Sequence, residues 1–155
     1  MSRIRFDFGS LTLDAELLDT PTTKAVAAAL PIRSSVLTWG EEVYFGIGIA
    51  IARESDARAL VTPGEIAYWP DGRCIAIGFG RTPISGENET RLAKPVQRLR
   101  QSARQREGAE RRASRRAGVG HLAWKLIRRL RKTVRRSVRG PAVSVSRCAC
   151  PRERA

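Results

Sequence analysis

Histidine is nearly absent from this chain, since His121 is the only one among 155 residues. That count removes most Ser–His, Cys–His and His-rich metal chemistry within a single chain. Cysteine is scarce as well, and Cys74, Cys148 and Cys150 are an odd number with no disulfide framework. The last two make no zinc site, because two further ligands at a suitable spacing are missing. We therefore assign no catalytic residue and expect no metal and no cofactor.

Long apolar runs are missing too. No stretch approaches the ~20 apolar residues that a helix needs to span a bilayer. The chain begins MSRIRFDFGSLTLDAELL, which alternates in polarity and lacks the continuous apolar core of a signal peptide. These two absences favour a cytoplasmic protein.

Acidic residues are almost missing from the second part of the chain. Residues 1–90 hold 8 Lys+Arg and 12 Asp+Glu, a formal charge of −4, whereas residues 91–155 hold 21 and 3, a formal charge of +18. The first part has the composition of a compact domain and the second that of a polycation. A segment with this charge would bind nucleic acid or an anionic membrane without specificity.

What is present in the first part is a series of short strands. Apolar residues alternate with polar ones on both sides of a Gly9–Ser10 turn, so residues 3–17 predict a hairpin. A short helix is predicted where Thr20 and Pro21 precede KAVAAAL, and Pro31 ends it. Further strands are predicted at 32–39, 41–47, 65–69 and 74–80, and the polar residues 52–62 predict a loop or a helical turn.

The basic part contains two kinds of segment. Residues 98–117 are dense in Arg, Ala, Ser, Gln and Glu, which is the composition of disorder or of a solvated helix. Between residues 121 and 139 apolar side chains recur every four positions among Lys and Arg, and Gly140–Pro141 follows. This spacing predicts a cationic amphipathic helix that would lie on an acidic bilayer surface.

Two motifs, TWGEEVYF at residues 38–45 and GEIAYWPDGRCIAIGFGRTPIS at residues 64–85, carry a family resemblance. The sequence resembles the small prokaryotic cyclophilin-like barrel proteins of uncharacterised function. Their signature is a Trp-Gly-Asp/Glu-Glu strand entry, followed by a Tyr-Trp-Pro-x-Gly hairpin and a Phe-Gly-Lys/Arg-Thr-Pro ending. The match covers residues 3 to about 95. It implies a mainly β fold, a small closed or partly closed cyclophilin-like β-barrel with one or two short helices.

The resemblance breaks off after RLAKP, residues 91–95. In the family the chain then returns to strands, whereas here an Arg-rich sequence follows. An antiparallel barrel needs its closing strands to remove its edges. We therefore expect a barrel over residues 1–95 that lacks those strands, with a disordered or helical basic tail over 96–155. An unpaired edge would favour oligomers.

Two explanations for this tail remain open. A reading-frame shift near codon 96 would give Arg-, Ala- and Ser-rich text from GC-rich DNA, and the composition favours it. A genuine basic extension that replaces the closing strands is the other explanation. Translation of the other two downstream frames separates the two explanations.

Candidate ligand-binding residues cluster within the matched region: Trp39, Glu41, Glu42, Tyr44, Phe45, Tyr68, Trp69, Arg81 and Thr82. Five of them are aromatic and fall in two strands, so they form either barrel core or the wall of a cleft for a small or extended apolar ligand. Glu41 and Glu42 are adjacent and point to opposite faces of a strand, so they cannot serve one site as an acid–base pair. We expect one carboxylate to be solvated and the other to anchor a turn.

Arg81, in GFGRTP, invites comparison with cyclophilin-type prolyl isomerases, which need an apolar pocket and an arginine aimed at the prolyl nitrogen. The Phe-His-Arg and Gln-Gly-Gly runs of those enzymes are absent, and His121 lies outside the matched region. The predicted function is therefore binding of an unknown small molecule or peptide in a barrel cleft. Binding of nucleic acid or an anionic membrane through the tail is the alternative, and prolyl isomerisation stands third.

Overall fold

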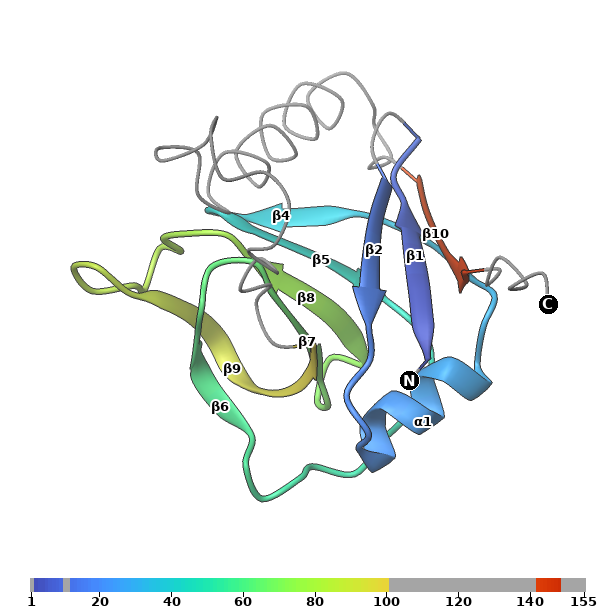
Figure 1. Ribbon diagram of the computed structural model, residues 1–155. Helices are drawn as coiled ribbons and strands as arrows, with labels where there is room; N and C mark the ends of the chain where they lie inside the picture. The colour runs from blue at the N-terminus through green and yellow to red at the C-terminus, as the bar shows by residue number, and fades with distance from the viewer. Residues whose placement is uncertain (1, 10–11, 101–141, 149–155) are drawn as a thin grey trace, which may run out of the picture.

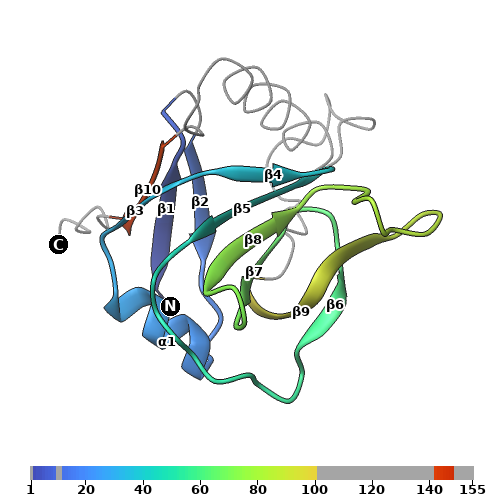
Figure 2. The same ribbon diagram turned by 180° about the vertical axis from the view of Figure 1, so that it is seen from behind.

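The computed structural model describes residues 2–9, 12–100 and 142–148. These residues form one short helix and two antiparallel sheets that pack face to face (Figures 1 and 2). The amphipathic helix predicted at 121–139 lies outside the described residues. No helix within the described ranges is long and apolar enough to cross a membrane.

The first sheet has four strands, and its third strand comes from far along the chain. In spatial order the strands are β2 (Thr12–Glu16), β1 (Arg3–Asp7), β10 (Ala142–Arg147) and β3 (Ile32–Ser35). The β1–β2 hairpin confirms the one predicted from the alternation of polarity. Strand β10 pairs on one side with β1 and on the other with β3.

The expectation that no strand follows residue 95 is wrong. Strand β9 runs on to residue 100, so residue 95 lies inside a strand, and β10 adds a further one. The short segment AVSVSR alternates in polarity, and Val143 and Val145 are buried at 1% and 0% exposure. This alternation is hidden among Arg-rich neighbours. The reading-frame shift concerns the DNA and stays a prediction.

The second sheet has six strands. Their order is β4 (Leu37–Trp39), β5 (Glu42–Gly46), β8 (Cys74–Gly78), β7 (Glu65–Trp69), β9 (Thr90–Arg100) and β6 (Arg58–Val61). The strands predicted around β4, β5, β7 and β8 are confirmed. Strand β6 lies where a loop or a helical turn was expected, and it holds its place by pairing with β9.

The predicted short helix is confirmed as α1 (Pro21–Ala28), and it lies at one end of the sheets (Figure 1). Thr20 and Thr23 form a reciprocal capping box at its first turn, and Val26 is fully buried. The backbone and the hydroxyl of Thr22 both donate to the Glu54 carboxylate, which ties the helix to the loop before β6.

The main hydrophobic core lies between the sheets. Side chains of Ile4, Phe6 and Val145 meet Phe45 and Tyr68 from the six-stranded sheet. The mainly β fold is thus confirmed, but the barrel is not, because neither sheet of the described residues closes on itself. The chain passes from one sheet to the other between β3 and β4, which are separated by Val36 alone.

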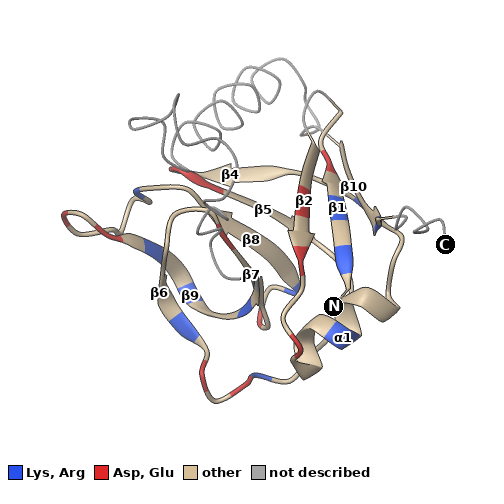
Figure 3. Cartoon of the chain, in the orientation of Figure 1, with Lys and Arg blue, Asp and Glu red and all other residues tan. Residues whose placement is uncertain are grey.

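Charged side chains on the hairpin pair across its two strands. Arg3 contacts Glu16 and Arg5 contacts Asp14, each with N···O distances of 2.7 Å. Figure 3 shows basic residues on β1 opposite acidic residues on β2, and further basic residues on β6 and β9. Exposed pairs of this kind contribute little to stability, so the hairpin depends mainly on its buried face.

Candidate functional site

A pocket of about 200 Å³ opens on the six-stranded sheet, on the face turned away from the other sheet. Strand alternation separates the two faces: Val43 and Phe45 point into the main core, while Glu42 and Tyr44 point into the pocket. The residues that line the pocket come from β4, β5, β7 and β9 and are Trp39, Glu42, Tyr44, Trp69, Leu92, Ala93, Lys94 and Val96.

The middle of this sheet face, next to the pocket, carries small side chains. Ala76 on β8 is aligned with Tyr44 on one side and with Ala67 of β7 on the other. Both alanines belong to a second, smaller hydrophobic cluster, against which Tyr44 and Trp69 pack. Ala67 and Ala76 are almost fully buried, so the aromatic rings of Trp39, Tyr44 and Trp69, and not these alanines, line the pocket.

Strand β9 supplies the remaining wall through a bulge. Arg58 of β6 is aligned with Val96 of β9, and Leu60 of β6 is aligned with Arg91 of β9. The segment 92–95 of β9 therefore stands opposite a single residue of β6. That segment is LAKP, and Pro95 has no N–H to donate to a ladder. Bulges redirect side chains and are common beside functional sites. Strand β9, with this bulge, brings four side chains to the pocket that the sequence did not single out: Leu92, Ala93, Lys94 and Val96.

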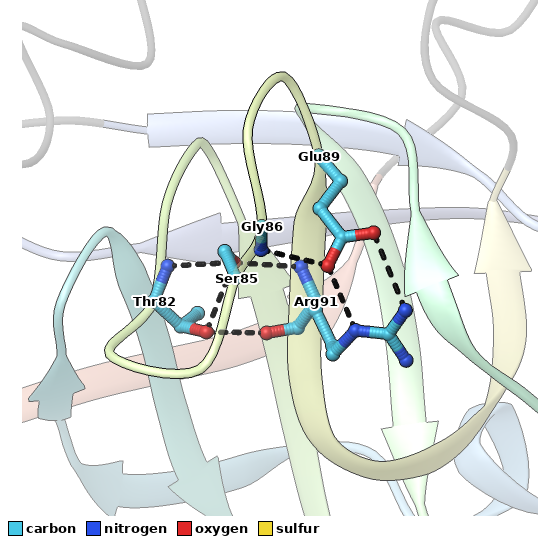
Figure 4. Close-up of polar contacts among 5 residues, drawn as sticks. All are labelled: Thr82, Ser85, Gly86, Glu89 and Arg91. Atoms are coloured by element: carbon cyan, nitrogen blue, oxygen red, sulfur yellow. Dashed lines mark hydrogen bonds and ion pairs between the residues drawn. The ribbon is translucent and has the colours of Figure 1, made fainter.

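The start of β9 is held by a polar cluster shown in Figure 4. The hydroxyl of Thr82 donates to the carbonyl oxygen of Arg91, and the Ser85 hydroxyl accepts from the backbone N–H of Arg91 at 3.0 Å. The Glu89 carboxylate accepts from the Arg91 guanidinium and from the backbone of Gly86 at 2.8 Å each. Thr82, a predicted ligand residue, therefore anchors the pocket wall and does not line the pocket.

Glu42 is the one acidic side chain that lines the pocket. It is only 6% exposed, and its Oε2 atom is buried without a hydrogen-bond partner. Burial raises the pKa of this carboxyl from 4.5 to about 7, because the charged form loses its hydration. A carboxyl with such a pKa is part protonated and part ionised near neutral pH.

Glu41 lies in the turn between β4 and β5, so it does not share a strand with Glu42 as expected. Its Oε2 accepts a hydrogen bond from the backbone N–H of Arg81 at 2.9 Å, and its own N–H donates to the Arg81 carbonyl at 2.9 Å. Gly40, with φ of +61°, and Gly80 leave room for this contact. Glu41 thus anchors the turn, whereas Glu42 is buried and not solvated. Arg81 is exposed and does not line the pocket.

Two of the predicted aromatic residues belong to the core. Phe45 is fully buried and makes edge contacts with the rings of Phe6 and Phe8. Tyr68 is also fully buried, and its hydroxyl donates to the Ile49 carbonyl at 2.7 Å and accepts from the Ile51 N–H at 3.2 Å. These contacts hold the segment after β5 and leave neither ring for a ligand.

The ring of Trp69 is held by the turn that follows β7. A Cβ atom added to Gly72 would lie 2.4 Å from Cε3 of Trp69, so the indole packs directly on the glycine backbone. This turn belongs to the Tyr-Trp-Pro-x-Gly motif, and the contact of Gly72 with Trp69 fixes one wall of the pocket. The indole Nε1 of Trp69 is buried without a hydrogen-bond partner.

Metal ligands do not gather at this site. Within the described part of the chain, no three side chains of His, Cys, Asp or Glu are placed to hold one ion. Cys74 on β8 donates to the Gly72 carbonyl, and its thiol pKa is raised by burial and, less strongly, by the charge of Glu42. The site consists of aromatic rings, one buried carboxyl and a lysine on the bulge.

Comparison with known proteins agrees with this fold. The family model described as cyclophilin-like matches residues 2–112. The structure is also similar to the solution structure of a hypothetical protein from Archaeoglobus fulgidus, with a TM-score of 0.63 and 27% sequence identity over 95% of each chain. None of the curated proteins compared with the chain matches it. The chain belongs to the cyclophilin-like family.

Proposed function

We propose that this protein binds a small molecule, or one side chain of a peptide, in the pocket on the six-stranded sheet. The observation that carries the proposal is the Glu42 carboxyl, which is buried in the pocket with an unpartnered oxygen. A buried polar group without a partner costs about 1–3 kcal/mol, and more when it is charged. A ligand that hydrogen-bonds to Glu42 would remove that penalty.

The composition of the pocket supports the same proposal. Ligand sites are mostly apolar and contain a few polar groups that orient the ligand. Here Trp39, Tyr44 and Trp69 supply apolar area, and Glu42 supplies the polar anchor. The volume of about 200 Å³ is below the ~300–1,000 Å³ of sites for drug-sized ligands, which favours a small molecule or a single side chain.

A fragment screen by protein-observed NMR tests this proposal. Fragments that bind here should shift the indole N–H resonances of Trp39 and Trp69 and compete with one another. The variant Ala93→Leu adds bulk to an exposed residue of the pocket wall and should weaken these fragments about tenfold or more. Ala28→Leu, on the exposed side of α1, adds the same bulk elsewhere and should leave binding unchanged.

Two results would contradict the proposal. The first is a library of cationic, neutral and anionic fragments in which nothing binds at millimolar concentration. The second is a set of fragments that bind Ala93→Leu as well as they bind the parent protein, because such fragments would occupy another part of the surface.

A further inference from the structure

We propose that the pocket selects a compact organic cation, a substituted ammonium group, which lies among the rings of Trp39, Tyr44 and Trp69 and faces the carboxylate of Glu42. This inference rests on the proposed function and names the class of ligand. The same head group is offered by a free ammonium compound and by a lysine side chain of a peptide. The experiment below separates the two sources.

The charges around the pocket support a cationic ligand. Glu42 has no hydrogen bond or ion pair from any residue that the structure describes, although its side chain is 94% enclosed by the protein. The other buried carboxylate on this sheet face, Glu65, accepts from the Arg58 guanidinium and from the Thr62 N–H. Glu65 is therefore paired with a cationic side chain of the protein, whereas Glu42 is paired with none of the described residues.

Lys94 does not act as the cationic partner of Glu42. It lies on the β9 bulge at the pocket wall with an exposed side chain, and no ion pair joins it to Glu42. Burial is the sole cause of the raised Glu42 pKa, so the lysine charge does not stabilise the carboxylate. No described residue therefore supplies a counter-ion for the ionised form of Glu42.

The three aromatic rings support a cation for an independent reason. The face of an indole or phenol ring carries negative potential and attracts a cation within about 6 Å of its centroid, by roughly 2 kcal/mol when the site is desolvated. Trp39, Tyr44 and Trp69 come from three different strands and line one hollow. A neutral apolar ligand would use the same surface but would leave Glu42 unpartnered, and an anion would be repelled by its charged form.

A matched pair of probes tests the inference. Choline carries a trimethylammonium group, and 3,3-dimethylbutan-1-ol is its neutral carbon isostere. Isothermal titration of the full chain at pH 8 should give choline an affinity at least about tenfold above that of the alcohol. N-acetyl-lysine amide is the third probe. If the lysine amide, with its side-chain ammonium free, binds more tightly than choline, the natural ammonium group comes from a peptide lysine. If it binds more weakly, the ammonium group comes from a free small molecule.

Three variants test which residues of the pocket interact with the cation. Glu42→Gln keeps the shape of the side chain and removes its charge, so choline should bind about tenfold more weakly while the alcohol changes by less than about twofold. Retained binding of the alcohol shows that this variant is folded. Trp69→Leu should weaken choline as well. Lys94→Met should increase the affinity for choline, because a positive charge at the pocket wall is lost.

The outcomes separate this inference from the proposed function. If the alcohol binds as tightly as choline, or if Glu42→Gln binds choline as tightly as the parent protein does, selection of a cation is excluded. The pocket then remains a ligand site. If the fragment screen returns only neutral or anionic ligands and choline and the lysine amide do not bind, the cation is again excluded. If no probe and no fragment binds, the proposed function is lost as well.

Discussion

Glu42 and Glu65 are both aligned with Gly78, one from each side of β8, and their side chains share one face of the sheet. Arg58 neutralises Glu65 at an N···O distance of 2.9 Å, whereas no described residue neutralises Glu42. Two carboxylates in equivalent strand positions therefore have opposite electrostatic environments. Glu65 is therefore part of a structural ion pair, whereas Glu42 has no partner among the described residues.

Replacement of Glu42 by glutamine should make stability less dependent on pH. The folded protein holds the Glu42 proton between pH 4.5 and about 7, where the unfolded chain releases it, so stability falls as pH rises through this window. Each pKa unit corresponds to about 1.4 kcal/mol. We expect Glu42→Gln to match the parent at pH 4.5 and to exceed it by about 1 kcal/mol or more at pH 8 in urea denaturation.

Glu65→Gln is the matched control for that measurement. It leaves the Arg58 guanidinium and the Thr62 N–H with a weaker acceptor, so it should destabilise the fold by about 1–3 kcal/mol at pH 8. The titratable groups on the same sheet face, namely Tyr44 on β5 itself and Glu65, Cys74 and Lys94 on other strands, are unchanged in Glu42→Gln. If the stability of the parent protein rises between pH 5 and pH 8 relative to that of Glu42→Gln, the raised pKa of Glu42 is contradicted.

Gly72→Ala should displace the ring of Trp69. The added Cβ would come within 2.4–2.7 Å of three indole carbons, and the ring would have to move. Overpacking of this kind costs about 1–3 kcal/mol. We expect lower stability, a shifted Trp69 indole resonance and weaker ligand binding. Gly46→Ala is the control, because a Cβ at that exposed position meets nothing within 4 Å, and it should bind ligands like the parent.

Thr82→Val should loosen the β9 bulge. The change removes the hydroxyl that donates to the Arg91 carbonyl and contacts Ser85, in a residue that is 5% exposed. The loss should be about 1–3 kcal/mol of stability, with faster amide exchange over residues 91–96. Thr12→Val, at an exposed position on β2, should change neither property. Unchanged exchange in Thr82→Val would show that the polar cluster does not hold the bulge.

Val145→Ala should destabilise the whole fold. Val145 is fully buried, and its strand pairs with β1 and β3. Deletion of two buried methyl groups costs about 2 kcal/mol when the site cannot collapse. Ser146→Ala, on the opposite face of β10, is the control and should be near neutral. A parent-like unfolding midpoint for Val145→Ala would show that β10 contributes little to the core.

The elements predicted from sequence are those with strong local signals. The hairpin of β1 and β2, the Thr20-capped helix and the strand before Pro70 each combine alternation or capping with turn residues. Strand β6 begins at Arg58 and spans only four residues, so its conformation depends on pairing with β9. Strand β10 has clear alternation, but Arg-rich flanks obscured it.

The site could be predicted only in part. Trp39, Glu42, Tyr44 and Trp69 were candidates from their strand motifs, and all four line the pocket. The β9 wall was missed because a bulge depends on register with a distant strand. Nor does the sequence distinguish Glu42 from its neighbour Glu41, since it does not show that β5 begins at Glu42 and that Glu41 lies in the turn before it.

The place of β10 between β1 and β3 has a consequence for synthesis on the ribosome. β1 ends at Asp7, but the strand that flanks it opposite β2 begins only at Ala142. At about 5–20 residues per second, roughly ten seconds pass between the emergence of the two strands. During that interval the nascent chain presents the open edges of β1 and β3, which makes it a substrate for chaperones that shield unpaired strands.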